Sequence, residues 1–284
     1  MSRLRPLNPA EAVRRRIARE VHKVFHSSPA EPRVTRSPDA LIAANSVAWR
    51  VHGDVTTMMV GGIAALLLQM LHPAALAGVW DHSDFEADML GRLRRTARFI
   101  AVTTYADRTE GEAMIARVKA IHDRVDGTLP DGRRYSANDP DTLAFVHIAG
   151  ALSFLDAYIR FVAPRMSPAE QDAYFAEVAG IARALGADPV PTSRAEAESL
   201  LDRFRPALQS DARTRRVRDL ILGAPAKHAA AVPVQALLIQ AAIDLLPADA
   251  RAMHGLSRSL ITRPALNLAT AGLSRTLRWA LATG

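Results

Sequence analysis

The sequence predicts an all-α protein, and three observations support this fold class. Ala, Leu and Arg dominate the 284 residues while aromatic residues make up only 5%, so helix formers outnumber strand formers. Apolar residues recur at intervals of three and four, and the alternation typical of strands is nearly absent. Several segments begin with Ser, Thr, Asp or Asn followed by Pro or Glu, which is the pattern of helix N-caps.

We expect one large domain over residues 1–284, with about ten helices around a central apolar helix. The apolar fraction of 49% is sufficient for a sizeable core. No change of composition marks a second domain, and no internal repeat is visible.

The N-terminal 38 residues are expected to form a helix followed by an extended arm. Residues 8–26 begin with Asn8 as a cap and carry apolar residues at every fourth position, so they favour a helix. Residues 27–38 contain three prolines and three serines, which indicates an extended connection.

The central helix is expected over residues 54–71, after another helix at 39–52. It is apolar nearly all round, so we place it in the middle of the core. Asp54 is suited to cap it, and His72-Pro73 ends it.

The remaining elements are predicted from caps, glycines and prolines. Thr109 with Glu112, and Ser167 with Glu170, show the capping-box spacing at two helix starts. Leu129 to Tyr135 indicates a turn or small hairpin. We expect a short helical turn at 74–80, a polar loop at 81–85, and helices at 89–104, 110–125, 140–162, from 168, from 193 to about 204, at three further segments punctuated by Pro206, Pro233 and Pro247, and at 264–281.

Composition excludes several kinds of function. The chain has no cysteine, which excludes disulfides, zinc–thiolate sites, iron–sulfur clusters and cysteine nucleophiles. The net charge of +7 is Arg-rich and scattered along the chain, as in proteins of high-GC genomes. No helix-turn-helix or basic patch with aromatic residues accompanies it, so no nucleic-acid partner is expected.

The sequence also indicates a cytoplasmic location. Arg14 to Arg16 are not followed by the apolar stretch of a secretory signal. The longest apolar run, Met58 to Leu71, is interrupted and too short to cross a bilayer. We therefore expect no transmembrane segment.

The histidines limit the kinds of metal site. No HExxH motif or paired Glu-x-x-His motif occurs, so zinc and di-iron carboxylate sites have little support. A haem held by one protein ligand remains open. The segment from Gly61 to His122 supplies a helical histidine, an apolar wall and arginines for the propionates. Five other histidines lie in ordinary contexts: His22, His26, His52, His228 and His254.

Arg92, Arg95 and Thr96 form a candidate anion-binding face. On a helix these residues are spaced i, i+3 and i+4, so they share one side. Three hydrogen-bond donors on one face suit an anionic group, although a solvated basic face has the same spacing.

The residues around this face resemble the MpaB-type oxygenase family, which includes the catalytic domain of latex-clearing rubber oxygenases. The resemblance is clearest over residues 45–165 and looser in the C-terminal third. It is carried by an ordered set of blocks: Gly53-Asp54, Gly61 to Gln69, His72-Pro73, Asp81 to Phe85, Gly91 to Thr96, Arg117 to His122, Tyr135 to Pro140, and Val146-His147.

The resemblance implies an all-helical fold and a haem b cofactor. His122 matches the position of the axial iron ligand. Arg92 and Thr96 match the Arg and Thr that rubber oxygenases need for haem binding or activity. The residue before this Thr is a distal Lys in rubber oxygenases, whereas here it is Arg95.

The Arg95 departure alters the expected site chemistry. Arginine does not readily lose its proton, so Arg95 is expected to donate hydrogen bonds to a haem propionate or to the bound oxygen. Arg95 and Thr96 are then the candidate catalytic residues. The resemblance implies an oxygenase or peroxygenase that uses O₂ or peroxide on a small hydrophobic substrate, with a C=C bond as one option. Polyisoprene is not expected, because no secretory signal is present.

Several alternatives stay open. His147 lies mid-helix among apolar residues and could line the haem pocket or replace His122 as ligand. His72 is the other cofactor-binding candidate, although its place before a proline favours a structural hydrogen bond. Asp81-His82 is suited to lock a loop. A non-catalytic haem- or lipid-binding protein of the same fold is the alternative function, and a homodimer is compatible with the sequence.

Overall fold

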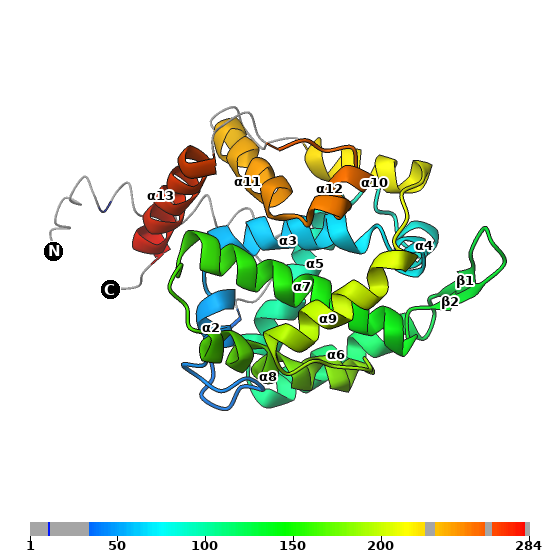
Figure 1. Ribbon diagram of the computed structural model, residues 1–284. Coiled ribbons are helices and arrows are strands. Elements are labelled where there is room, and N and C mark those ends of the chain that lie inside the picture. Colours follow the sequence, from blue (N-terminus) through cyan, green and yellow to red (C-terminus); the bar gives the residue numbers. More distant parts are fainter. Residues whose placement is uncertain (1–10, 12–33, 225–230, 259–262, 282–284) are drawn as a thin grey trace, which may run out of the picture.

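The computed structural model describes residue 11 and residues 34–224, 231–258 and 263–281 (Figure 1). This part of the chain contains twelve α-helices and one two-stranded hairpin, so the all-α prediction is confirmed. The predicted helix over 8–26 lies, apart from Glu11, outside the described residues. The helices are α2 (Val47–His52), α3 (Val55–Gln69), α4 (Pro73–His82), α5 (Met89–Tyr105), α6 (Arg108–His122), α7 (Pro140–Phe161), α8 (Pro168–Leu185), α9 (Arg194–Phe204), α10 (Ala212–Leu222), α11 (Val232–Leu245), α12 (Ala248–Met253) and α13 (Arg263–Leu281), with a 3₁₀ helix η1 (Arg205–Ala207) after α9.

Helix α3 is central, as its apolar composition predicts. Asp54 caps it by accepting a hydrogen bond from the Thr57 amide at 2.9 Å. The helix packs closely on α7, because Gly61 has no side chain: a Cβ there would lie 2.8 Å from the Ser153 carbonyl oxygen. Helices α11 and α13 cover α3 on the side away from α2 and α8 (Figure 1).

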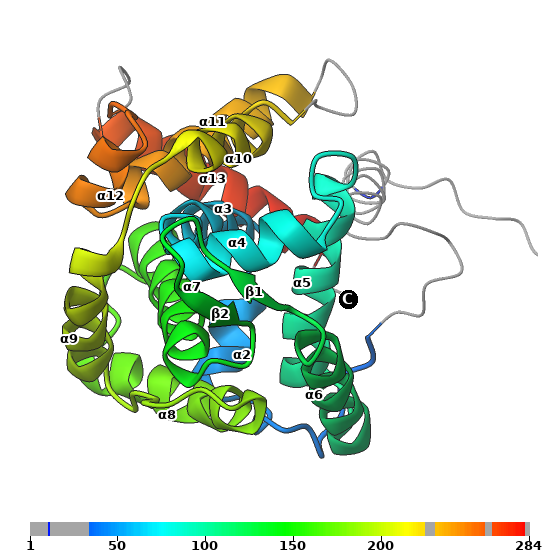
Figure 2. The ribbon, with the colours of Figure 1, turned by 90° about the vertical axis from the view of Figure 1, so that its right-hand side faces the viewer.

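Helices α5 and α6 form an antiparallel pair beside this core (Figure 2). The two helices pack on each other, α5 also packs on α2, and α6 also packs on α8. The pair places the first turn of α5 next to the last turn of α6. A hydrogen bond of 2.7 Å from the Asn138 side chain to Asp123 joins the end of α6 to the segment before α7.

Helix α13 joins the C-terminal part of the chain to the start of α3. Arg278 donates to the Asp54 carboxylate at 2.7 Å, and Ser274 donates to the same carboxylate oxygen at 2.8 Å. Asp54 is buried, with 3% of its surface exposed. The carboxylate that caps α3 therefore also anchors α13.

Two helix starts differ from the prediction. The helix expected from residue 39 begins at Val47, because Asn45 adopts a φ of 64° and Ser46 is the cap. The backbone before it pairs instead with the start of α6, through a bridge between Ala40 and Asp107. Asp107 also caps α6, so the capping box predicted for Thr109 with Glu112 is wrong.

Helix α4 is longer than predicted and includes Asp81 and His82, the first two residues of the expected polar loop. It begins after His72, whose ring nitrogen accepts from the Ala75 amide, and it extends to His82. The predicted hairpin is present as β1 (Asp126–Thr128) paired with β2 (Arg134–Ser136). It projects from the helices at one end of the molecule (Figure 1).

Helix α7 is the one described helix that by itself is long and apolar enough to cross a membrane. Helices α3 and α4 pass the same test only as a pair bent by 100°. In the fold, 72% of the apolar window of α7 is buried against other helices, which is typical of a core helix.

Candidate active site

Three imidazoles have a buried ring nitrogen without a hydrogen-bond partner among the described residues. These atoms are Nδ1 of His122, at the end of α6, Nε2 of His147, in the first half of α7, and Nδ1 of His254, just after α12. The other ring nitrogen of His254 lies 2.7 Å from the Leu67 carbonyl oxygen, which holds that ring in the core, so His122 and His147 remain the candidates. Burial lowers the pKa of both residues, and that of His147 falls to about 4. Both rings are therefore neutral near pH 7, which is the form that binds a metal ion.

Arg92 lies close enough to His122 for its charge to act on the imidazole. Its positive charge contributes to the lowered pKa of His122, after the larger effect of burial. Arg92 comes from the first turn of α5, and burial lowers the pKa of its own guanidinium. Its hydrogen bond to the Ser83 hydroxyl is long, at 3.4 Å. Within the described residues no carboxylate pairs with it, so this guanidinium is suited to receive an anion.

The other two residues of the predicted Arg-Thr face lie differently. Arg95 donates to the Asp88 carboxylate at 2.9 Å, and 67% of its side chain is exposed. The exposed Thr96 donates its hydroxyl proton to the Arg92 carbonyl oxygen at 3.2 Å. The structure therefore brings Arg92 and His122 together, and it holds Arg95 on the N-terminal cap of α5.

His72 lies away from His147. Its ring stacks on Phe145 with centroids 4.8 Å apart and meets Phe204 edge-on. Phe145 and His147 differ by two positions on α7, so they point to opposite sides of the helix. His72 thus forms the backbone hydrogen bond expected of a residue before Pro73.

Asp81 and His82 hold the β-hairpin to α4. The Tyr135 hydroxyl donates to Asp81 at 2.7 Å, and Nε2 of His82 lies 3.0 Å from the Asp126 carbonyl oxygen. The locking contact predicted for this pair is present, although it forms at a helix end and acts on the hairpin.

His52 is a buried residue that the sequence analysis treated as ordinary. Its ring nitrogens lie 2.9 Å from the Thr104 hydroxyl and 3.0 Å from the Tyr174 hydroxyl. Burial, followed by the effect of the nearby His147, lowers its pKa to about 4. A lone His before a glycine carries no signal for this environment, because all its partners are distant in sequence.

An apolar surface formed by α3 and α7 lies next to His52. The ring of Phe154 meets His52 edge-on at 6.0 Å and lies over Gly62 and Gly150, within 3.8 Å of the Cβ positions of both glycines. Gln69 fixes the register of the two helices by donating to the Val146 carbonyl oxygen at 2.9 Å. Several apolar side chains of this surface remain partly exposed, namely Ile63, Leu66, Val146 and Phe154.

These residues fit a flat cofactor with one protein ligand. Unpaired buried nitrogens supply the ligand, Arg92 supplies a partner for a carboxylate, and the partly exposed apolar surface supplies contact area. Within the described ranges no group of three or more His, Asp or Glu side chains is placed to hold a bare metal ion. A haem ligated by one histidine does not require such a group.

The structure is that of an all-helical domain with a neutral, buried imidazole near an arginine that no described carboxylate pairs with. The family model of the ER-bound oxygenase mpaB/B'/rubber oxygenase catalytic domain matches residues 49–280. The match covers most of the chain, so the protein belongs to this family of oxygenases. No curated protein and no solved structure matches the chain.

Proposed function

We propose that this protein is a haem b-dependent oxygenase that acts on a small hydrophobic substrate. The observation that carries the proposal is the His122 imidazole, which is neutral and has a buried, unpaired Nδ1 beside the Arg92 guanidinium. Membership of an oxygenase family supports the reaction class.

His122 would hold the iron, and Arg92 would bind a haem propionate. A guanidinium forms a strong paired hydrogen bond with a carboxylate, and here it has no competing carboxylate among the described residues. A propionate bound to Arg92 would also offset the positive charge that lies next to His122.

His147 would line the same space from α7. Its low pKa keeps it neutral, so it is available to accept a hydrogen bond at Nε2. The surface around Phe154 would orient an apolar substrate and exclude water. When bound, haem supplies the activation of O₂ or peroxide.

The test is an absorption spectrum of the purified protein during titration with haemin. We expect a Soret band in the wild type and its loss in His122→Ala. His82→Ala is the matched control, because this exposed histidine contacts only the hairpin and its loss should leave the band unchanged.

The other outcomes separate the alternatives. A band lost only in His147→Ala would transfer the ligand role to His147. Failure of the wild type to take up haemin would contradict the proposal. A stable haem complex without turnover of alkenes in the presence of O₂ or peroxide would favour a haem-binding protein without activity.

A further inference from the structure

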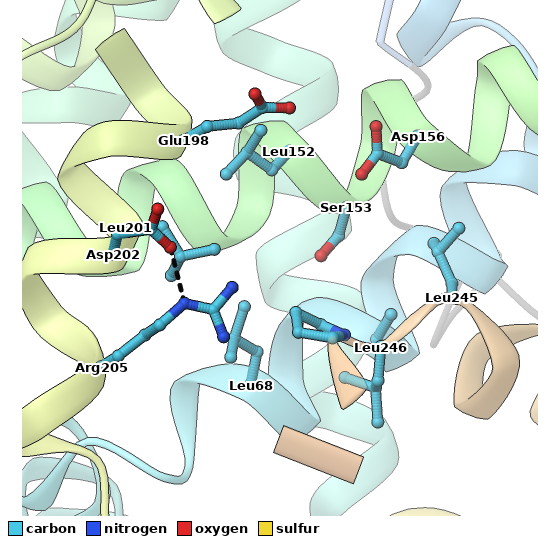
Figure 3. A pocket seen from close by; sticks show the side chains of 12 residues that line it. Leu68, Leu152, Ser153, Asp156, Glu198, Leu201, Asp202, Arg205, Leu245 and Leu246 are labelled. Carbon is cyan, nitrogen blue, oxygen red and sulfur yellow. Dashed lines mark hydrogen bonds and ion pairs between the residues drawn. The ribbon is translucent and has the colours of Figure 1, made fainter. Parts of the chain in front are cut away.

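A cleft lies between α7 and its neighbouring helices, lined by residues other than those of the candidate active site (Figure 3). It has a volume of about 370 Å³ and is bordered by α3, α7, α9 and the turn between α11 and α12. Asp156 points into it from α7. His147 and Asp156 are nine positions apart, which places them on opposite faces of the helix. The cleft is therefore separate from the site proposed for haem.

The floor of this cleft is apolar and belongs to the core. Leu68 of α3, Leu152 of α7 and Leu201 of α9 line it, and each has at most 7% of its surface exposed. Leu246 closes the floor from the turn after α11. A rigid leucine surface of this kind favours the hydrocarbon part of a ligand.

The rim of the cleft is mainly acidic. Asp156, Glu198 and Asp202 line it, against the single guanidinium of Arg205. Arg205 is already paired with Asp202 at 2.6 Å and with Asp249. Arg194, which is not part of the lining, donates to Asp156 and to Glu198, each at 2.7 Å. With Arg194 counted, the three carboxylates still outnumber the two guanidinium groups, so the net charge around the cleft is negative and favours a positively charged ligand.

Ser153 provides an unpaired polar group between the floor and the rim. Only 8% of its surface is exposed, and its hydroxyl points into the cleft between Arg205 and Leu246 (Figure 3). Serine in a helix commonly donates to the carbonyl four residues earlier, as Ser83 does to Val79. The Ser153 hydroxyl forms no hydrogen bond with another described residue. The residue is nine-tenths buried while its hydroxyl is open to the cleft and has no protein partner, which points to a ligand group at this position.

We propose that this cleft binds a small organic ammonium compound. Its hydrocarbon part would lie on the leucine floor, and its ammonium group would lie among the carboxylates of Asp156, Glu198 and Asp202. The Ser153 hydroxyl would accept one of the ammonium protons. This proposal is independent of haem binding, because none of these residues belongs to the candidate active site.

The experiment is calorimetric titration of the full-length protein with n-hexylammonium chloride, n-hexanoate and hexan-1-ol. We expect the ammonium compound to bind at least about tenfold more tightly than the other two, since each lacks the cation. Equal affinity for all three compounds, tighter binding of hexanoate or no binding at all would overturn the proposal.

A pair of glutamate variants tests the site. Glu198→Gln removes a carboxylate from the rim and should weaken hexylammonium binding by about fivefold or more. Glu170→Gln is the matched control, because Glu170 is also a partly exposed partner of an arginine but lies outside the cleft. Equal effects of the two variants would contradict the site. Circular dichroism of each variant verifies the fold.

Two further variants complete the test. Ser153→Ala removes the hydroxyl without adding bulk and should weaken binding, whereas unchanged affinity would contradict its role. His122→Ala should retain hexylammonium binding. Loss of binding in that variant would mean that the amine binds at the haem, and it would overturn the second site.

Discussion

At the scale of the residue, His52 shows how burial controls the charge of an imidazole. Both of its nitrogens are hydrogen-bonded to hydroxyl groups, and its pKa falls to about 4 because the folded protein does not solvate its charged form. In the unfolded chain the same imidazole returns to its ordinary value of 6.5. Protonation therefore favours the unfolded state.

The pH dependence of stability follows from this difference. As the pH falls from 6.5 to about 4, the unfolded chain binds a proton at His52 that the folded protein does not bind. The free energy of unfolding should decrease by about 1.4 kcal/mol per pH unit for this residue, and His147 should contribute similarly. Urea denaturation of haem-free protein between pH 7 and 4.5 measures the slope.

Two variants isolate the contribution of His52. His52→Gln lacks the titrating group, so its slope should be smaller than that of the wild type by about one proton. Tyr174→Phe removes a hydrogen-bond partner but keeps the imidazole, so it should lower the stability without reducing the slope. Identical slopes in wild type and His52→Gln would refute this explanation.

The residues of the candidate site were predictable to different degrees. Arg92 and His122 come close to each other because α5 and α6 are consecutive antiparallel helices. Proximity that depends on neighbouring helices can be predicted from the sequence. The position of Arg95 on Asp88 was not predictable, because helical spacing places the backbone and leaves a long side chain free to fold back. His52 was missed because its partners are on α5 and α8.

At the scale of the element, the starts of helices were best predicted where one side chain determines the cap. Asp54 and Ser167 cap α3 and α8 as expected. The start of α2 was not predicted, because residues 37–40 pair with the α5–α6 region by backbone hydrogen bonds. Such pairing depends on the tertiary fold and leaves no local pattern.

The close contact of α3 and α7 gives a second prediction. Gly61→Ala would place a methyl group 2.8 Å from the Ser153 carbonyl oxygen, so the helices must separate. We expect destabilisation by about 1–3 kcal/mol, as for other overpacked cores. The midpoint of thermal unfolding and the haemin affinity should both fall.

Gly180→Ala is the control for the Gly61 variant. Gly180 is an exposed residue within α8, and no atom lies within 4 Å of its Cβ position. Replacing it by alanine should stabilise the protein by about 0.5–1 kcal/mol through helix propensity. Destabilisation of both variants to the same extent would show that the Gly61 contact has no special role.

At the scale of the whole molecule, the Asp54 carboxylate connects the beginning and the end of the described fold. Arg278→Met would leave a buried carboxylate with fewer partners, and we expect a loss of about 2 kcal/mol. Arg275→Met, at an exposed position of the same helix, should change the stability by less than about 0.5 kcal/mol. Equal losses in the two variants would argue against the anchor.

Helix α7 carries both His147 and part of the cleft lining, and this has a thermodynamic consequence. His147 lies on one face of the helix, and Ser153 and Asp156 line the cleft. If an amine in the cleft alters the position of α7, it must change the affinity of the protein for haem, and haem must change the affinity for the amine by the same factor. The cleft would then act as a regulatory site, at which a cationic metabolite controls the oxidation without contacting the haem or the substrate.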